Sequence, residues 1–179
     1  MNYATIKKTD VANGPGVRVS LFVSGCTHAC KGCFNAEAWD FAYGAPYIQE
    51  SEQEILKALE PGHIRGLSLL GGEPMEPQNR GTVLELVRKV RALYPSKDIW
   101  CYTGYEYEKD LLRWEAEGDT VVSELLDSID VLVDGEFVEK RKNLRLAFRG
   151  SENQRLIDLK QTRREGRVIC LELQSKGMA

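Results

Sequence analysis

Three of the five cysteines in this chain fall within eight residues, in the segment Cys26-Thr27-His28-Ala29-Cys30-Lys31-Gly32-Cys33. Thiolates are soft ligands that suit iron–sulfur clusters and zinc, and these sites normally take four protein ligands. The spacing CxxxCxxC supplies three ligands, and no fourth cysteine lies nearby. The segment therefore predicts a four-iron, four-sulfur (4Fe–4S) cluster with one iron left open for chemistry. His28 lies among these ligands, and we do not expect it to be one.

The two remaining cysteines, Cys101 and Cys170, are isolated in the sequence. Two isolated cysteines cannot hold a second cysteine-ligated cluster, and we interpret both as small buried apolar side chains. Either one could still be a distant fourth ligand, which would close the open iron, and free thiols are the other alternative. An odd number of cysteines gathered in one loop does not indicate a disulfide framework.

The cysteine segment resembles the motif of the radical S-adenosylmethionine (SAM) superfamily, with Gly32 at a position that is usually aromatic. Further short strings resemble one branch, the activating enzymes of anaerobic (class III) ribonucleoside-triphosphate reductases. In chain order these strings are Asn13-Gly14-Pro15-Gly16-Val17-Arg18, Phe22-Val23-Ser24-Gly25, Cys33-Phe34-Asn35, Gly71-Gly72-Glu73-Pro74, Tyr102-Thr103-Gly104-Tyr105, Asp134-Gly135-Glu136-Phe137 and Arg149-Gly150-Ser151-Glu152-Asn153-Gln154. Each string alone is weak, and their common order makes the resemblance specific.

The resemblance implies a reaction, two cofactors and two partners. Cys26, Cys30 and Cys33 would hold the 4Fe–4S cluster, and SAM would bind at its open iron. Cleavage of SAM would give a 5′-deoxyadenosyl radical, which would take a hydrogen atom from a glycine of the large subunit of the reductase. The electron would come from an external donor such as a flavodoxin, because the chain has no room for further clusters.

The resemblance also implies the residues that contact SAM. Gly32, Cys33 and Phe34 would line its pocket, with Phe34 offering a ring face to the adenine. The Gly71-Gly72-Glu73 segment would meet the methionine amino group, and Thr103 and Asp134 would contribute from the next two loops, Asp134 directly or through a monovalent cation. The alternatives are core packing for Phe34 and simple turns for the others. The string 149–154 with Arg155 suggests either SAM recognition or docking of a partner. The charge run Lys140-Arg141-Lys142 suggests a solvated face or, together with Arg145, Arg149 and Arg155, a surface that meets an acidic partner.

Three other functions stay open at this point. The chain could activate a different glycyl radical enzyme, or act on a small molecule by the same radical chemistry. A third interpretation, of another class, is a non-catalytic iron–sulfur or zinc-binding module.

Composition favours a single soluble domain over residues 1–179. Of these residues, 42% are hydrophobic and 28% charged, as in ordinary globular proteins. The net charge of −3 and the pI near 5.6 indicate neither nucleic acid nor an anionic membrane as a partner. No apolar stretch is long enough for a membrane span, and no signal peptide is evident at the N-terminus, so we expect a cytoplasmic protein.

Hydrophobic patterns predict strands that alternate with helices. The expected strands are 17–23, 67–70, 99–102, 129–133, 156–159 and 168–171, and the expected helices are 51–59, 78–93, 106–117 and 121–126. Ser51 and Glu54 suggest a capping box for the first helix. The cysteine segment and three of the strings begin where a predicted strand stops, so they should converge at the carboxyl ends of a mostly parallel sheet. The chain is too short for eight units, which take about 250 residues, so we expect an α/β fold with a partial (β/α) barrel of about five or six units.

Overall fold

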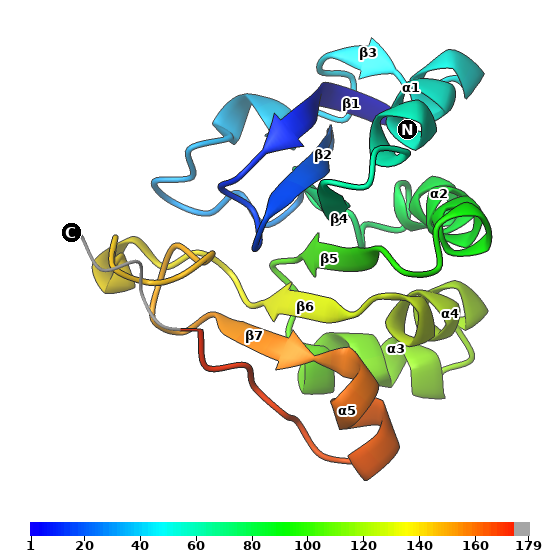
Figure 1. Cartoon of the computed structure of the whole chain (residues 1–179). Helices are drawn as coiled ribbons and strands as arrows, with labels where there is room; N and C mark the ends of the chain where they lie inside the picture. Colours follow the sequence, from blue (N-terminus) through cyan, green and yellow to red (C-terminus); the bar gives the residue numbers. More distant parts are fainter. Residues whose placement is uncertain (174–179) are drawn as a thin grey trace.

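The computed structural model of the protein describes residues 1–173, which form a seven-stranded sheet (Figure 1). The strands lie in the order β3-β1-β2-β4-β5-β6-β7. Their bounds are β1 Asn2–Asp10, β2 Val17–Val23, β3 Ala45–Pro46, β4 Ile64–Gly71, β5 Asp98–Tyr102, β6 Val131–Asp134 and β7 Arg155–Asp158. The four central strands, from β2 to β6, pair in parallel, whereas β1, β3 and β7 pair antiparallel with their neighbours.

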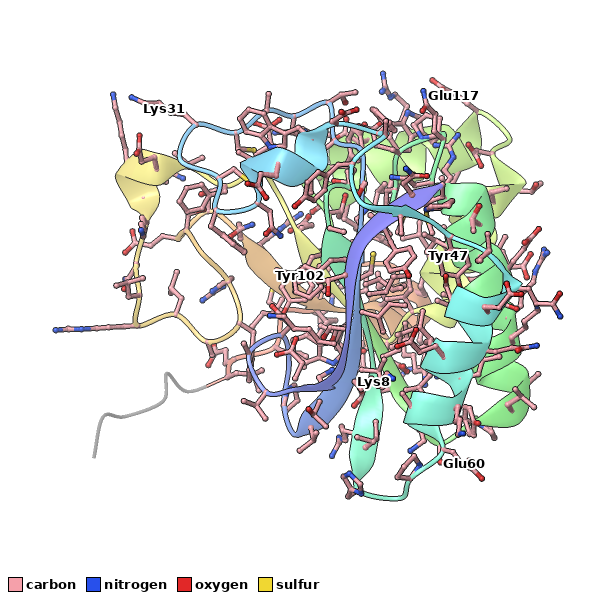
Figure 2. The ribbon with its side chains drawn as sticks, turned by 90° about the horizontal axis from the view of Figure 1, so that it is seen from above. Lys8, Lys31, Tyr47, Glu60, Tyr102 and Glu117 are labelled. Carbon is pink, nitrogen blue, oxygen red and sulfur yellow. The ribbon has the colours of Figure 1, made fainter. Side chains whose placement is uncertain are left out.

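Helices cover one face of the sheet, and the segment 135–154 lies over the other face (Figure 2). The helices are α1 Gln49–Leu59, α2 Arg80–Leu93, α3 Leu112–Ala116, α4 Thr120–Ser128 and α5 Leu159–Glu165, with 3₁₀ turns η1 Ala36–Trp39 and η3 Glu139–Arg141 and a π-helical turn η2 Tyr107–Leu111. The main core fills the space between sheet and helices, and a smaller cluster around Trp100 and Phe148 fills the other face. Of the helices between residues 1 and 173, none combines the length and the apolar character that a membrane crossing needs.

Helix α2 shows why the sequence pattern predicts most of these elements. Its side chains at Val83, Leu86, Val87 and Val90 recur every three or four residues, and all four are fully buried against the sheet. Leu93 continues the same spacing but is 58% exposed, because it is the last residue of the helix and lies beyond the edge of the core. The predicted strands 17–23, 67–70, 99–102 and 129–133 correspond to β2, β4, β5 and β6.

The sheet is α/β and its centre is parallel, but the partial barrel of five or six units is not confirmed. Within residues 1–173, only three helical crossovers join parallel neighbours, and the sheet ends at β3 and β7. The chain leaves β6 through the segment 135–154 without a helical crossover, so β7 returns antiparallel to β6. The sequence pattern also missed β1, whose side chains are mostly polar and half-exposed.

Two further sequence predictions were wrong in detail. Helix α1 begins at Gln49, two residues before the predicted cap, so Ser51 lies inside the first turn and donates a hydrogen bond to the Tyr3 hydroxyl instead (3.5 Å). The segment 168–171 is not a strand, because only Cys170 forms a bridge to Ile157.

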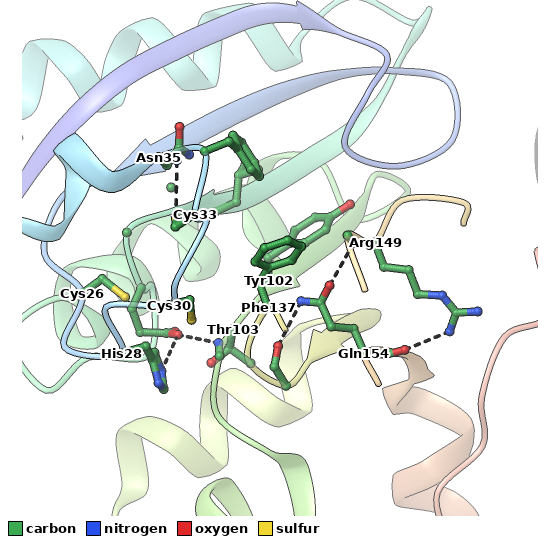
Figure 3. Close-up of a pocket in the computed structure, with 18 of the residues that line it drawn as sticks. Cys26, His28, Cys30, Cys33, Asn35, Tyr102, Thr103, Phe137, Arg149 and Gln154 are labelled. Carbon is green, nitrogen blue, oxygen red and sulfur yellow. Dashed lines mark hydrogen bonds and ion pairs between the residues drawn. The ribbon is translucent and has the colours of Figure 1, made fainter. Parts of the chain in front are cut away.

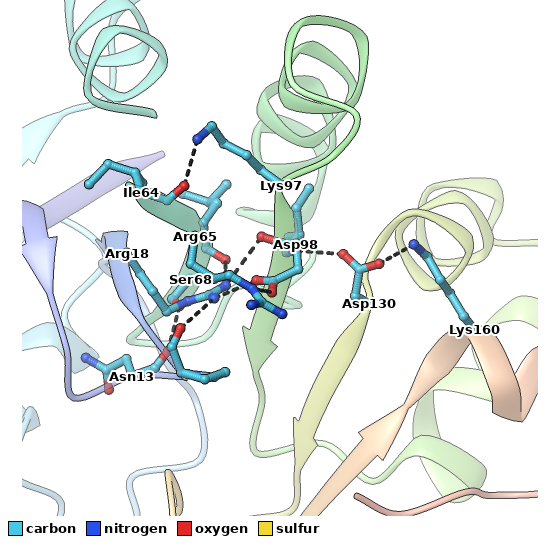
Figure 4. Close-up of polar contacts among 12 residues, drawn as sticks. Asn13, Arg18, Ile64, Arg65, Ser68, Lys97, Asp98, Asp130 and Lys160 are labelled. Atoms are coloured by element: carbon cyan, nitrogen blue, oxygen red, sulfur yellow. Dashed lines mark hydrogen bonds and ion pairs between the residues drawn. The ribbon is translucent and has the colours of Figure 1, made fainter. Parts of the chain in front are cut away.

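Buried Arg18 links the amino ends of the central strands (Figure 4). Its guanidinium is 0% exposed and lies 2.5 Å from Asp98 Oδ1. It donates to Ser68 Oγ (2.7 Å), and that hydroxyl donates to the Asn13 carbonyl (2.6 Å). This network fixes the Asn13-Gly14-Pro15-Gly16 turn against β4 and β5.

Candidate functional site

The carboxyl ends of the parallel strands surround a cavity of about 380 Å³ (Figure 3). All three cysteines of the 26–33 segment, called the loop cysteines below, line it. The other predicted site residues that line it are Phe34, Gly71, Gly72, Glu73 and Thr103. Gly32 and Asp134 do not line it. The expected convergence of loops from four different strands is therefore present in the structure.

Backbone N–H groups point at the sulfur atoms of the loop cysteines. Cys33 Sγ accepts from the Asn35 N–H (3.4 Å), Cys26 faces the N–H groups of His28 and Ala29, and Cys30 faces that of Phe137. Burial raises the pKa of the Cys26 thiol to about 12 and also raises that of Cys30, so both are protonated without a metal. Iron would displace these protons, and the N–H groups would then stabilise the thiolates.

The loop cysteines line one cavity but do not meet at a single point. Among residues 1–173, no three histidine, cysteine or carboxylate side chains converge on one point as ligands of a metal ion. A 4Fe–4S cluster takes one thiolate at each iron, so its ligands surround a volume instead. Cys101 is fully buried in the main core and Cys170 is exposed at its bridge to β7, and neither lines the cavity. The buried, apolar interpretation is thus confirmed for Cys101 and wrong for Cys170.

His28 lies between two carboxylates. Its Nδ1 lies 2.7 Å from Glu136 Oε1, and its Nε2 lies 3.2 Å from Glu73 Oε2 in an ion-pair contact without hydrogen-bond geometry. Burial alone would lower the pKa of His28, but Glu73 and Glu136 outweigh it and raise the pKa to about 9. The side chain is only 9% exposed, so the imidazole is largely buried between these carboxylates.

Glu73 joins three of the loops that form the cavity. Its carboxylate is 1% exposed; Oε1 accepts from the Met75 N–H (2.8 Å) and Oε2 from the Gly104 N–H (2.7 Å), besides the contact with His28. Gly104 must be a glycine here, because a Cβ would lie 2.6 Å from the imidazole ring of His28. One buried carboxylate thus connects the ends of β4 and β5 to the cysteine segment.

Gly72 allows the end of β4 to touch the start of the cysteine segment. Its N–H donates to Val23 O (2.7 Å), and the next N–H, of Glu73, donates to Gly25 O (2.8 Å). A Cβ at Gly72 would lie 2.5 Å from Gly25 O and 2.8 Å from Ala38 O. The glycine is required by this close backbone approach.

Two polar residues that sequence reasoning missed support the same contact. Asn79, 1% exposed, donates from Nδ2 to Ser24 O and to Glu73 O (both 3.0 Å). Glu76 Oε1 accepts from the N–H (2.8 Å) and the hydroxyl (2.6 Å) of Thr27. Their position just before a helix suggests ordinary capping residues, so the sequence offers no distinct signal for this role.

Thr103 and Asp134 differ in their surroundings. Thr103 lines the cavity, and its Oγ1 accepts from the Tyr105 N–H (3.1 Å). Asp134 is 1% exposed, accepts from the Tyr107 N–H (2.9 Å) and pairs with Arg155, which also bridges to Glu108. Asp134 lies in a neighbouring hollow of about 570 Å³ that shares His28 and Gly104 with the cavity.

The string 149–154 forms a turn that closes on itself (Figure 3). Gln154 Oε1 accepts from the N–H groups of Gly150 (2.9 Å) and Ser151 (3.1 Å), and its Nε2 donates to Gly135 O (3.0 Å). Arg149 donates to Gln154 O (2.9 Å) and lines the cavity. Phe34, by contrast, is 87% exposed beside the cavity, so core packing was the wrong alternative for it.

A sheet that brings three cysteines to one cavity, with neither other cysteine beside them, provides thiolate ligands of the kind that an iron–sulfur cluster takes. Residues 12–157 match the protein family described as 4Fe-4S single cluster domain. Three similar proteins carry the name anaerobic ribonucleoside-triphosphate reductase-activating protein. The protein of Vibrio cholerae is 47% identical over 86% of this chain and 96% of its own length. The protein of Escherichia coli K12 is 42% identical over 86% of this chain and 96% of its own length. The protein of Enterobacteria phage T4 is 42% identical over 87% of this chain and 93% of its own length. The chain belongs to the family of anaerobic ribonucleoside-triphosphate reductase-activating proteins.

Proposed function

We propose that this chain is a SAM-dependent activating enzyme that generates a glycyl radical on the large subunit of an anaerobic ribonucleoside-triphosphate reductase. The observation that carries the proposal is the cavity itself, where three cysteines and no fourth share a wall with Gly71, Gly72 and Glu73. Three thiolates leave one iron of a 4Fe–4S cluster open. When bound, the reduced cluster and SAM supply a 5′-deoxyadenosyl radical that takes a hydrogen atom from the target glycine.

The residues of the chain hold and orient these groups. Cys26, Cys30 and Cys33 ligate the cluster, and the N–H groups of the cysteine segment stabilise their charge. The protein adds no redox chemistry of its own, and its contribution is binding, orientation and electrostatics.

The cavity offers contacts that suit SAM. Tyr102 OH and Arg149 Nε are buried beside it and have no hydrogen-bond partner among residues 1–173. A buried polar atom without a partner costs about 1–3 kcal/mol, so a ligand with hydroxyl and ring-nitrogen acceptors would stabilise both. SAM carries such atoms in its ribose and adenine.

We assign the remaining contacts as follows. The backbone of Gly71-Gly72-Glu73 borders the subsite for the methionine amino group, Phe34 covers the adenine, and Thr103 contacts SAM from the end of β5. Gly32 and Asp134 act indirectly. Gly32 shapes the cysteine segment with its positive φ of 76°, and Asp134 positions Gly135.

Two partners and a location complete the proposal. An external donor such as a flavodoxin delivers the electron, because Cys101 and Cys170 lie apart and build no second cluster. The reductase presents its glycine at the open side of the sheet, where the sheet and the segment 135–154 act as the partial barrel that the resemblance implies. We place the reaction in the cytoplasm, where thiols stay reduced.

Anaerobic reconstitution with iron and sulfide tests the proposal. Dithionite and SAM should then yield 5′-deoxyadenosine, and addition of the large reductase subunit should give a glycyl radical doublet in the EPR spectrum of that subunit. A protein that binds iron but does not cleave SAM would be a cluster carrier. A doublet on a different glycyl radical enzyme, with none on the reductase, would overturn the choice of partner.

A further inference from the structure

Of the two most exposed large apolar side chains among residues 1–173, one lines the cavity and the other lies two residues before a lining residue. Leu144 is 89% exposed and Phe34 is 87% exposed. Phe34 lines the cavity, and Leu146, two residues beyond Leu144, lines it as well. Exposed apolar side chains at the edge of a site are typical of surfaces that bind another protein.

The same edge is strongly basic. Residues 140–145 include Lys140, Arg141, Lys142 and Arg145 with no acidic residue among them, although the whole chain carries a net charge of −3. All four are exposed, and none forms an ion pair with residues 1–173. Other arginines of the structure, such as Arg91 and Arg163, pair with carboxylates. We call these four residues with Leu144 the rim face.

Two arginines that follow the rim face in the sequence differ from it, because they have partners within the structure. Arg155 bridges Asp134 and Glu108, and Arg149 donates to Gln154 O within its own turn. Both therefore have structural partners. The string 149–154 and Arg155 suggested either SAM recognition or partner docking. Because these arginines are engaged within the structure, we assign partner docking to the basic residues of the segment 140–145.

Hydrogen bonds hold the segment of the rim face in a defined shape. Asn143 N–H donates to Gly150 O (3.2 Å), Glu152 N–H donates to Arg141 O (3.0 Å), and Asn143 Nδ2 donates to Glu152 Oε1 (2.9 Å). Because the segment is ordered before any partner arrives, binding loses less conformational entropy.

We propose that the rim face is the docking surface for the large reductase subunit, which would bind it through an acidic patch around an apolar recess. The inference rests on the proposed function, since the protein that inserts a glycine into the cavity must also cover the edge of that cavity. Basic side chains on one partner attract an acidic surface on the other, and the exposed Leu144 supplies the apolar anchor.

A charge-reversal variant tests the surface. In the full chain, Arg141→Glu, Lys142→Glu and Arg145→Glu are combined, and Lys57→Glu is the control, because Lys57 is an exposed basic residue of α1 on the face covered by helices. The Kd for the large subunit should rise about tenfold or more at low ionic strength, and the difference should shrink with added salt. The control should stay within about twofold of the parent.

A second variant tests the apolar contact. Leu144→Ser should raise the same Kd by about tenfold, with little dependence on salt. In both variants 5′-deoxyadenosine formation without the reductase should match the parent, while the EPR doublet on the reductase falls.

The outcomes separate this inference from the proposed function. A parent that neither cleaves SAM nor binds the reductase would refute the proposed function itself. A parent that transfers the radical, with unchanged binding and transfer in both variants, would overturn the docking surface alone. Unchanged reductase binding together with slower reduction by a photoreduced flavodoxin would also overturn it, and would assign the rim face to the electron donor.

Discussion

Replacing Gly72 by alanine places a methyl group between two carbonyl oxygens of the cysteine segment. The new Cβ would lie 2.5 Å from Gly25 O and 2.8 Å from Ala38 O, closer than such atoms can approach. Both oxygens belong to backbone that is itself hydrogen-bonded, since Gly25 N–H donates to Ala38 O (2.8 Å) and Glu73 N–H donates to Gly25 O (2.8 Å). The segment must therefore move away from β4, and Cys26 moves with it.

The cost can be estimated from these contacts. Forcing one extra carbon into tight packing costs about 1–3 kcal/mol. The two hydrogen bonds at risk contribute about 1 kcal/mol each, and the stiffer unfolded chain of alanine returns less than about 1 kcal/mol. The expected loss of about 2–4 kcal/mol corresponds to a Tm lower by roughly 4–16 °C for a chain of this size.

Two assays on one preparation check this prediction. Thermal unfolding of the metal-free protein measures the stability, and iron and sulfide content after anaerobic reconstitution measures the effect on the cluster. Gly81→Ala is the matched control, because a Cβ at Gly81 meets nothing within 4 Å in helix α2. A Gly72→Ala protein with the stability of the parent and a full iron load would refute the close-approach argument.

The remaining predictions concern the cluster, the buried arginine and one carboxylate. Alanine at any one of the three loop cysteines should abolish SAM cleavage. Cys101→Ala should keep SAM cleavage and lower the free energy of unfolding in urea by on the order of 1 kcal/mol. If Cys101→Ala lost the cluster, Cys101 would be a fourth cluster ligand and the open iron would be refuted. Arg18→Met should lower the free energy of unfolding by about 2–4 kcal/mol, because Asp98 loses its buried partner while keeping Arg65; a loss under about 1 kcal/mol would contradict the network. Burial raises the pKa of Asp130, but bonds from Arg91, Lys160 and the Ile99 N–H outweigh it, and the pKa in the folded protein is lowered. Its stabilisation is thus present above the unfolded pKa and lost as the pH falls below about 4. Asp130→Asn should cost about 1–3 kcal/mol at neutral pH and less in acid, and an equal loss at both pH values would contradict the assignment.

The sequence predicts the parts of the fold that depend on regular burial. Strands β2, β4, β5 and β6 are rich in buried apolar residues, and α2 has a clear apolar stripe, so their patterns are distinct. Strand β1 lies near the edge of the sheet and carries polar residues on both faces, which leaves no pattern to detect. The direction of β7 depends on how the segment 135–154 crosses the sheet, which local periodicity does not encode.

The sequence likewise predicts some residues of the candidate site and misses others. The positions of the loop cysteines, Gly72 and Thr103 follow from strand ends and spacing, and the structure brings them together. The roles of Asn79 and Gln154 depend on carbonyl groups that are distant in sequence or belong to an irregular turn. Spacing carries no information about such partners, so these residues emerge only from the three-dimensional arrangement.

The turn that Gln154 closes also bears on how this protein can diverge. The segment 135–154 is braced largely by its own hydrogen bonds, including the bridge between Lys142 and Ser151, and it contributes no strand to the sheet. Substitutions and small insertions near its tip leave the register of β5, β6 and β7 unchanged. Related chains can therefore acquire a new partner by altering this one segment, while the cysteine segment and the strands that position it stay as they are.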